Sequence, residues 1–318
     1  MSDDHYSTLD EIPFADLYLE AAPSACRIRA IDGRRGLEAL PESVYSDLRR
    51  LYEVVVSHAR TAADPSHFSV PYEDTLYRVQ AIHDVRGTVY ALRKGLKQVP
   101  DLSSCGIAQP VLDILLEKQY GLILFVGGFG SGKTTAASSF VREMTFRGSM
   151  SVTLEDPPEL PLSGDHGLGR CLQVQVNRKL IESAIEDTLR MAFDLLFISE
   201  IRTPGMAAEA IKASINGKLI VSTMHADSVV SAVSRIISLA SESGSGLSEK
   251  NARETLASGL AGIVYMARLP GNRRGATEYL LGGGDVSGKI MSGEYKGLQN
   301  VVNNLRNRLN NGLPISGD

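Results

Sequence analysis

The chain has 318 residues, of which 43% are hydrophobic and 22% are charged, and its formal net charge is −4. This length and apolar content allow a sizeable core, organised in roughly two domains. The small negative charge disfavours a dedicated nucleic-acid-binding protein, because such proteins usually carry a basic surface. The three cysteines are scattered without a CxxC pair, so neither a zinc site nor a disulfide framework is indicated and a cytoplasmic protein is expected.

The sequence gives no sign of a membrane-spanning segment. No apolar run approaches the roughly 18 residues that a membrane helix needs. Residues 1–11 are acidic and lack the apolar stretch of a signal peptide, and we expect them to form a loose tail. Any association with a membrane is therefore expected to be peripheral.

The first part of the chain mixes strand and helix patterns. Apolar and polar residues alternate in 14–31 and again in 67–93, which predicts two groups of half-buried strands. Apolar residues at helical spacing predict a helix within 42–62. Residues 1–100 are therefore predicted to form an α+β domain, followed by a linker at 101–107.

The remainder, 108–318, alternates between short apolar runs and segments with helical spacing. Strands are predicted at 121–126, 150–154, 194–199, 218–223 and 262–267, and helices at 108–118, 133–147, 178–192, 205–216, 227–241 and 248–259. This alternation predicts a mainly parallel sheet covered by helices. After residue 268 the sequence is rich in Gly and Asn and shows only short strand and helix signals.

The sequence FVGGFGSGKTT, 125–135, lies between a predicted strand and a predicted helix, and it matches the phosphate-loop (Walker A) pattern. The first N–H groups and the dipole of a helix favour a phosphate there, and glycines allow the backbone to approach it. Lys133 is expected to reach the β- and γ-phosphates, and the Thr134 hydroxyl to bind Mg²⁺. The residues predicted to bind the nucleotide are Gly127, Gly128, Gly130, Ser131, Gly132, Lys133, Thr134 and Thr135. The alternative is a glycine-rich turn with a surface lysine.

The nucleotide is predicted to be ATP rather than GTP, because the chain shows no N-K-x-D-like guanine-recognition sequence. Hydrolysis also needs one carboxylate that orients water and another that supports Mg²⁺.

Two further predicted strands end in carboxylates. One apolar run leads to Glu155 and Asp156, and another leads through Ser199 to Glu200. Ligands of parallel sheets lie at the carboxyl ends of the strands, so the carboxylates at both strand ends are expected to face the phosphate loop. The alternative is that these carboxylates cap helices or lie in solvent.

A third predicted strand ends at Thr223 and His225. A histidine at a strand end near a γ-phosphate could donate a hydrogen bond to it and respond to its loss. A lone histidine is more often structural. The order of the three motifs along the chain therefore has to support a functional role for His225.

The order of the motifs along the chain is typical of one protein family. A Walker A loop, an E-D-P-x-E box, an apolar strand into S-E-x-R and an S-T-x-H-x-x-S box together resemble the type II/type IV secretion ATPase superfamily, the PilT- and GspE-like motors. Residues 14–20, FADLYLE, are similar to the family's opening A-S-D-I-H-x-E, and the resemblance covers about 14–268. The compact length, the missing zinc tetracysteine and the tail after 268–270 are most similar to the DotB- and TraJ-type ATPases of type IVB secretion or conjugative transfer.

The resemblance implies a PAS-like N-terminal domain followed by a RecA-like P-loop ATPase domain, assembled as a homohexamer. It implies Mg²⁺-dependent ATP hydrolysis that moves one domain relative to the other. This motion would energise secretion, conjugative transfer or a pilus system. The protein would be cytoplasmic and peripherally associated with the inner membrane, with machinery proteins of that membrane as partners and no direct contact with nucleic acid.

The resemblance also implies roles for individual residues. Glu155, Asp156 and Glu159 would form an acidic box, with Glu155 near Mg²⁺, directly or through water. Glu200 would be the catalytic glutamate, and His225 would contact the γ-phosphate or the moving neighbour domain. Arginines from another domain or subunit would neutralise transition-state charge, the alternative being solvated sheet arginines; the candidates are Arg78, Arg93 and Arg202.

The chain departs from the family pattern at several positions. Ser199 replaces a glycine, Thr203 an aspartate and Lys218 a histidine, and Tyr265 lies near a common glutamine. Because the nucleotide-facing groups remain, these departures put the turnover rate and the subunit contacts in doubt more than nucleotide binding.

Two other functions stay open. A nucleic-acid translocase or helicase could use the same RecA-like core, although the low basicity and the box at 223–228 disfavour it. A non-hydrolysing ATP-binding scaffold is disfavoured by the presence of both Glu155 and Glu200.

Overall fold

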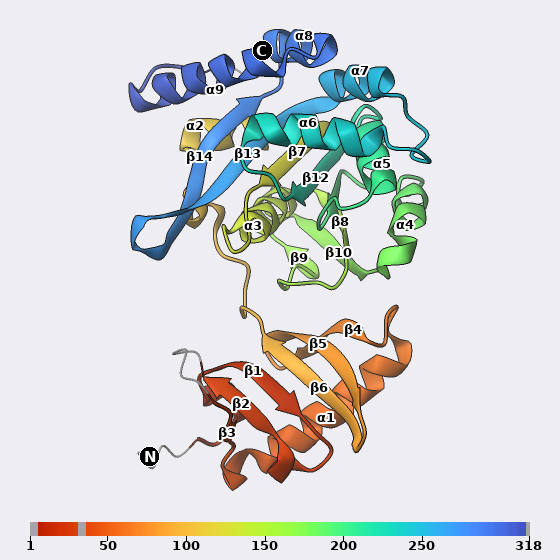
Figure 1. The fold of residues 1–318 in the computed structure, drawn as a ribbon. Helices are drawn as coiled ribbons and strands as arrows, with labels where there is room; N and C mark the ends of the chain where they lie inside the picture. The colour runs from red at the N-terminus through yellow and green to blue at the C-terminus, as the bar shows by residue number, and fades with distance from the viewer. Residues whose placement is uncertain (1–5, 31–35, 316–318) are drawn as a thin grey trace. The chain divides into compact units, whose positions relative to one another are not determined.

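The computed structural model describes residues 6–30 and 36–315 (Figure 1). Contacts within the chain define two compact units. The first comprises the residues up to Gln98 together with Asp156–Pro161 and Gln175–Arg178, and the remaining residues form the second.

The first unit is built on an antiparallel sheet. In the part of the unit that the structure describes, the strand order is β3-β2-β1-β6-β5-β4. The bounds are β1 Phe14–Leu19, β2 Arg27–Ala30, β3 Glu38–Ala39, β4 His67–Tyr72, β5 Thr75–Asp84 and β6 Gly87–Lys94. Along β5, Tyr77 and Val79 are buried while Arg78 and Gln80 are not, as expected for a sheet with one face in the core. The strands predicted from alternation are confirmed, although Ile31 lies outside the described residues.

Helix α1, Tyr45–Thr61, supplies the other layer of this core. Leu48, Leu51 and Val55 lie on one face of the helix and are at most 1% exposed, within the same cluster as Leu17 of β1. Burial of each such side chain contributes about 1.5–3 kcal/mol to folding. The predicted helix within 42–62 is confirmed, and it is preceded by a 3₁₀ turn.

The start of the chain differs from the predicted loose tail. Leu9–Glu11 form a 3₁₀ turn, and Leu9 is 1% exposed. The N–H of Leu9 donates to the carboxylate of buried Asp47, with N and Oδ2 2.8 Å apart. The acidic composition predicted solvent exposure, but a single buried leucine with a satisfied backbone fixes the segment. Residues 1–5 lie outside the described part of the chain.

Asp47 is itself held by several donors. Tyr72 donates from its hydroxyl (2.6 Å) and Arg50 from its guanidinium (2.6 Å). Burial raises the pKa of Asp47, but the hydrogen bonds from Leu9, Tyr72 and Arg50 outweigh it, so its pKa lies below the ordinary value. The buried carboxylate therefore stays ionised and joins the chain start to α1 and β4.

The second unit is built on a mainly parallel sheet with the order β14-β13-β7-β12-β11-β8-β10-β9. The bounds are β7 Gly121–Val126, β8 Met150–Glu155, β9 Gly164–His166, β10 Gly169–Gln175, β11 Leu195–Ile198, β12 Leu219–Met224, β13 Leu260–Leu269 and β14 Arg273–Leu281. Strands β13, β7, β12, β11 and β8 are parallel neighbours. Strand β14 pairs antiparallel with β13, and β9 pairs antiparallel with β10. The parallel sheet is confirmed, whereas the β9–β10 hairpin was not predicted.

Helices cover this sheet (Figure 1). Their bounds are α2 Gln109–Leu116, α3 Lys133–Phe146, α4 Ile181–Thr188, α5 Pro204–Ser214, α6 Val229–Ala240, α7 Glu249–Gly259, α8 Gly284–Ser292 and α9 Tyr295–Asn310. The helix predicted at 178–192 is shorter at both ends, because Arg178–Leu180 form a 3₁₀ turn before it and it already ends at Thr188. Within the described ranges no helix is long and apolar enough to cross a membrane.

Helix α9 is the largest departure from the expected short signals near the end of the chain. Leu298, Val302 and Leu305 are buried along one face, but asparagines around them narrow the apolar stripe. Arg306 of α9 pairs with Glu278 of β14, with Nη2 and Oε1 3.3 Å apart.

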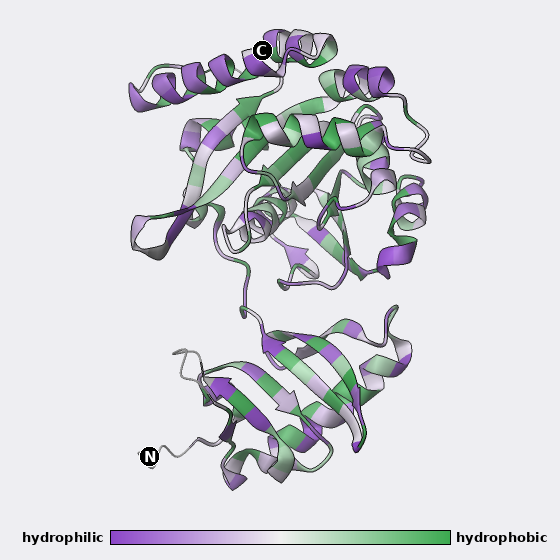
Figure 2. Cartoon of the chain, in the orientation of Figure 1, coloured by the Kyte–Doolittle hydropathy of each residue, from purple (hydrophilic) through white to green (hydrophobic). Residues whose placement is uncertain are grey.

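Strand β7 forms the centre of the second core, and each of its residues is buried. The Phe125 ring packs on Phe140 of α3, with centroids 5.9 Å apart. Figure 2 shows β7 and β12 as apolar strands inside the unit. A strand with neighbours on both edges and a helix on its face cannot tilt, so the loop that follows it has a fixed starting point.

Candidate functional site

The loop between β7 and α3 has the conformation that its glycines allow. Gly127, Gly130 and Gly132 have φ values of +151°, +66° and +94°, a region that other residues rarely adopt. A Cβ at Gly127 would collide with the carbonyl oxygen of Met266. Helix α3 begins directly after the loop, so its first N–H groups lack helical acceptors.

Ser131 supplies a direct test of whether this loop fits a phosphate. Its hydroxyl is buried, and within residues 6–30 and 36–315 it has no hydrogen-bond partner. Buried polar groups are normally satisfied, so an unsatisfied one inside a glycine cradle indicates a missing acceptor or donor. A phosphate oxygen fits this position, and the half-buried Thr134 follows in the first turn of α3.

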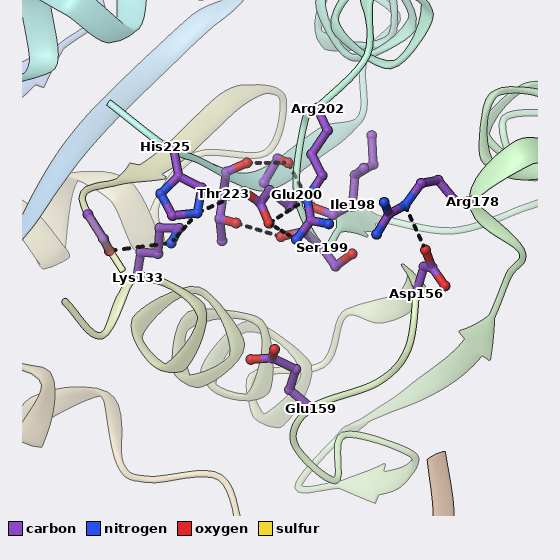
Figure 3. A network of polar contacts seen from close by, with 12 residues as sticks. Lys133, Asp156, Glu159, Arg178, Ile198, Ser199, Glu200, Arg202, Thr223 and His225 are labelled. Carbon is purple, nitrogen blue, oxygen red and sulfur yellow. Dashed lines mark hydrogen bonds and ion pairs between the residues drawn. The ribbon is translucent and has the colours of Figure 1, made fainter. Parts of the chain in front are cut away.

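Lys133 contacts the ring of His225, which follows β12. Its Nζ lies 3.3 Å from His225 Nε2 and 3.5 Å from the Gly128 carbonyl oxygen, to which it donates (Figure 3). The exposed Phe129 ring packs on the same histidine, with centroids 4.2 Å apart. The lysine that the sequence predicts to bind phosphates therefore lies against a histidine.

Glu200 follows β11 and also contacts His225. Its Oε1 lies 3.2 Å from His225 Nε2, and its Oε2 accepts from Arg202 Nε at 2.8 Å (Figure 3). The neighbouring strand ends are tied together by Thr223, whose hydroxyl donates to the Ser199 carbonyl oxygen at 2.6 Å. The structure thus brings together Lys133 of the phosphate loop and Glu200 and His225, which the sequence placed at the ends of two other strands.

The His225 Nε2 atom has two competing partners. It can accept a hydrogen bond from Lys133 or, when protonated, donate one to Glu200. Burial lowers the pKa of His225, and the Lys133 ammonium lowers it further, while Glu200 acts in the opposite sense. The net pKa lies below the ordinary value, so the neutral ring is favoured near neutral pH.

Glu155, at the end of β8, is 1% exposed. Its Oε1 accepts from the Thr153 hydroxyl and from the Gln173 amide, both at 2.8 Å. Gln173 lies on β10, so it went unnoticed because the sequence did not predict that hairpin. Two donors fix the orientation of this carboxylate.

The acidic box predicted from the sequence divides between the two units. Glu155 belongs to the second unit, whereas Asp156 and Glu159 belong to the first. Asp156 pairs with Arg178, with Oδ2 and Nε 3.1 Å apart, and Glu159 pairs with Arg78.

Arg78 and Arg93 lie directly opposite each other on β5 and β6. Like charges in this position are destabilising unless they are neutralised. Arg93 Nε lies 2.8 Å from Asp16 Oδ1, and Arg78 contacts Glu159. Both arginines line a hollow of about 420 Å³ on this sheet face, together with Arg29.

The donor set for a metal ion is sparse in the protein alone. In the described part of the chain no three His, Cys, Asp or Glu side chains gather into a metal site. Mg²⁺ commonly takes only one or two protein ligands and completes its shell with water and phosphate. The Thr134 hydroxyl at the start of α3 and the Glu155 carboxylate at the end of β8 are oxygen donors of the kind that Mg²⁺ accepts.

Two departures from the family pattern have local structural roles. The Thr203 hydroxyl caps α5 by accepting from the Met206 N–H at 3.3 Å, and it donates to Glu182 at 2.8 Å. Lys218 donates to the Phe193 carbonyl oxygen. These contacts stabilise elements beside the site without occupying it.

Sequence reasoning missed two arginines next to the phosphate loop. Arg268 on β13 donates from Nε to the Gly130 carbonyl oxygen at 3.2 Å, and Arg274 on β14 approaches Gly132. The sequence does show three arginines close together after a predicted strand. Their position beside the phosphate loop depends on β14 and on the strand order, which the sequence did not predict.

Comparison with known proteins identifies the family. Residues 85–278 match the model of a family described as "Type II/IV secretion system protein", so the chain belongs to this family. The type II secretion system protein HxcR of Pseudomonas aeruginosa is 34% identical over 147 residues, which cover 44% of this chain and 30% of that protein. The competence protein ComGA of Streptococcus pneumoniae is 35% identical over 162 residues, which cover 49% and 46%. The chain thus spans less than half the length of these relatives.

Solved structures show the same fold over nearly the whole chain. The pilus retraction motor PilT, solved with bound ADP, superposes with a TM-score of 0.74 at 23% identity, covering 92% of this chain and 86% of that one. The ATPase DotB of Legionella pneumophila superposes with a TM-score of 0.69 at 16% identity, covering 91% and 85%. The mixed α/β fold predicted from the sequence is therefore confirmed.

Proposed function

We propose that this protein is an ATPase that hydrolyses ATP with Mg²⁺ at the loop between β7 and α3. The observation that carries the proposal is the cluster of Lys133, Glu200 and His225 beside a glycine cradle with an unsatisfied Ser131 hydroxyl. Each of these groups serves phosphoryl transfer, in which catalysis is mainly positioning and charge stabilisation.

The binding step follows from the contacts of Lys133. Its Nζ would leave the His225 ring and donate to the β- and γ-phosphates, while the loop N–H groups and the Ser131 hydroxyl donate to phosphate oxygens. Mg²⁺, when bound, would neutralise charge on these phosphates. The Thr134 hydroxyl and, directly or through water, Glu155 would hold it.

The chemical step would fall to Glu200. Its carboxylate orients the attacking water and accepts its proton. Release of Lys133 leaves His225 Nε2 able to carry a proton and to donate to Glu200 or to the γ-phosphate. Arg202 pairs with Glu200 and so helps to orient that carboxylate.

Arg78 and Arg93 would contribute charge from the first unit of the same or another subunit. Both guanidinium groups line the same hollow on the sheet face, where each pairs with one carboxylate, and a phosphate would take the place of these carboxylates as their partner. Which subunit supplies them depends on the assembly, which we propose to be a homohexamer as the family resemblance implies.

At the level of the cell, we propose a motor for a type IV secretion, conjugative transfer or pilus system, of the IVB-like kind. The supports are membership of the type II/IV secretion family and a fold shared with PilT and DotB. The motor would work in the cytoplasm at the inner membrane with machinery proteins and without binding nucleic acid itself. It would consist of a PAS-like domain at 1–100, a linker at 101–107 and a RecA-like ATPase domain at 108–318.

ATPase activity of the purified chain, measured across protein concentration with its mass determined in parallel, tests this proposal. Glu200→Gln is expected to lower turnover by about 10²–10⁴-fold while leaving ATP binding intact, since only the proton acceptor is lost. Glu254→Gln, on the exposed surface of α7, is the matched control and should keep full activity.

Activity that rises with hexamer formation would support the motor. A wild-type chain that binds ATP without turnover in the assembled ring would contradict hydrolysis. Turnover unaffected by Glu200→Gln would contradict the role of that carboxylate, and turnover stimulated by DNA would favour a translocase.

A further inference from the structure

Three arginines lie at the turn end of the β13–β14 hairpin, which Figure 2 shows as strongly hydrophilic. Arg268 pairs with Arg274 in the antiparallel register, and Leu269 pairs with Arg273. Directly paired residues lie on the same face of a sheet, and adjacent residues lie on opposite faces. Arg268 and Arg274 therefore share one face, and Arg273 lies on the other.

The face with Arg268 and Arg274 meets the phosphate loop. Arg268 Nε donates to the Gly130 carbonyl oxygen at 3.2 Å, and a Cβ at Gly130 would collide with the same guanidinium. A Cβ at Gly132 would lie 3.1 Å from Cδ of Arg274. The glycines of this loop thus make room for the arginine side chains as well as for a ligand.

The charges of these arginines are not balanced by carboxylates. Across the ranges that the structure describes, neither Arg268 nor Arg274 forms an ion pair, and both are exposed. Two like charges directly opposite each other across two strands are destabilising. The hydrogen bond to Gly130 nevertheless holds the Arg268 guanidinium beside the loop, where its exposed plane is accessible to a ligand.

The strand order indicates which part of a bound nucleotide would contact Arg268 and Arg274. Glu200 and His225 follow β11 and β12, on one side of β7, whereas β13 and β14 lie on its other side. With the γ-phosphate at the Lys133, Glu200 and His225 cluster, a nucleotide that crosses the loop away from β12 would place its nucleoside half over the β13–β14 hairpin.

We propose that Arg268, supported by Arg274, forms the nucleoside side of the binding site. The guanidinium plane of Arg268, oriented by its bond to Gly130, packs on the base, an arrangement suited to arginine and not to lysine. This inference rests on the proposed ATP site, and it adds the residues that recognise the nucleoside half of the nucleotide.

Binding of two probes to the full chain separates the nucleoside from the phosphates. ADP carries both, and inorganic tripolyphosphate carries only phosphates. Arg268→Lys keeps the positive charge but removes the plane, so we expect ADP to bind about tenfold more weakly while tripolyphosphate binding changes less than about twofold. Arg273→Lys, one residue from Arg274 on the opposite face, is the matched control and should change neither.

Arg274→Lys provides a second variant, with a smaller loss for ADP and none for tripolyphosphate. Thermal unfolding without ligand verifies that each variant folds. An unchanged ADP affinity in both variants would overturn the inference alone. Equal losses for ADP and tripolyphosphate would also overturn it, because the arginines would then act only on the loop or its phosphates. A wild-type chain that binds neither probe would overturn the proposed function and this inference together.

Discussion

The two sides of the phosphate loop differ in how their charged groups are satisfied. Towards β12 and β11, Lys133 contacts His225, which contacts Glu200, which in turn pairs with Arg202. Towards β13 and β14, Arg268 lies opposite Arg274, and the described residues supply no carboxylate to either.

This difference suggests a division of labour. On the first side the groups satisfy one another, so a ligand must break contacts, above all the one between Lys133 and His225. On the second side nothing has to be broken, and a ligand finds cations already in place. We therefore expect substitutions on the first side to change the chemistry or to couple it to binding, and substitutions on the second side to change affinity alone.

Lys133→Gln should give the largest loss of binding. A charge-assisted hydrogen bond contributes about 1.5–3 kcal/mol, so ADP affinity is expected to fall roughly 10- to 150-fold. Calorimetric titration measures this effect, and Lys250→Gln on the exposed surface of α7 is the control. A change below threefold would mean that Lys133 remains with His225 when the nucleotide binds.

The pKa of His225 should change when Lys133 leaves the histidine ring for a phosphate. Burial and Lys133 both disfavour the proton and hold the pKa of His225 below its ordinary value. Withdrawal of Lys133 to a phosphate removes one of these causes, so ADP is expected to raise the His225 pKa, and Lys133→Gln is expected to raise it without ADP. Titration of the ring resonances by NMR measures both, with His225→Gln to assign them.

The same shift has a consequence for stability. The folded protein binds the His225 proton less readily than the unfolded chain does, so this group destabilises the fold as pH falls below 6.5. Denaturant midpoints of wild type and His225→Gln should therefore diverge below pH 6.5 and run parallel above it. A wild-type pKa above 6.5 would contradict the paired arrangement on this side of the loop.

Much of this site could be predicted from the sequence because local patterns determine it. A buried strand, a glycine loop and a helix start require only neighbouring residues, and parallel strands bring the ends at Glu200 and His225 to one edge. The β9–β10 hairpin and β14 were missed because their pairing depends on partners distant in sequence. Gln173 on β10 and Arg274 on β14 were missed with them, since each reaches its place only through that pairing.

Residues 6–11 of the first unit also depend on a partner that is distant in sequence. Their acidic composition predicted a loose tail, yet Leu9 is buried and its N–H is bound by Asp47 from α1. No local pattern around Leu9 could reveal a carboxylate 38 residues away. Composition describes the average of a segment, whereas a single anchor decides whether it is ordered.

Phe129→Ser should give the smallest effect and so sharpen the comparison between the two sides. The ring is 87% exposed and packs on His225, while Lys133 Nζ lies 5.7 Å from its centroid. Its removal admits water to the histidine, so the His225 pKa should rise, but by less than in Lys133→Gln because the ammonium remains.

ADP affinity in Phe129→Ser is expected to change by only about twofold, since an exposed ring contact contributes little. Phe146→Ser, at the far end of α3 and 57% exposed, is the control with the same chemistry. If Phe129→Ser instead weakened ADP as strongly as Arg268→Lys, the ring would contact the nucleoside, and the division between a catalytic side and a binding side of the loop would be wrong.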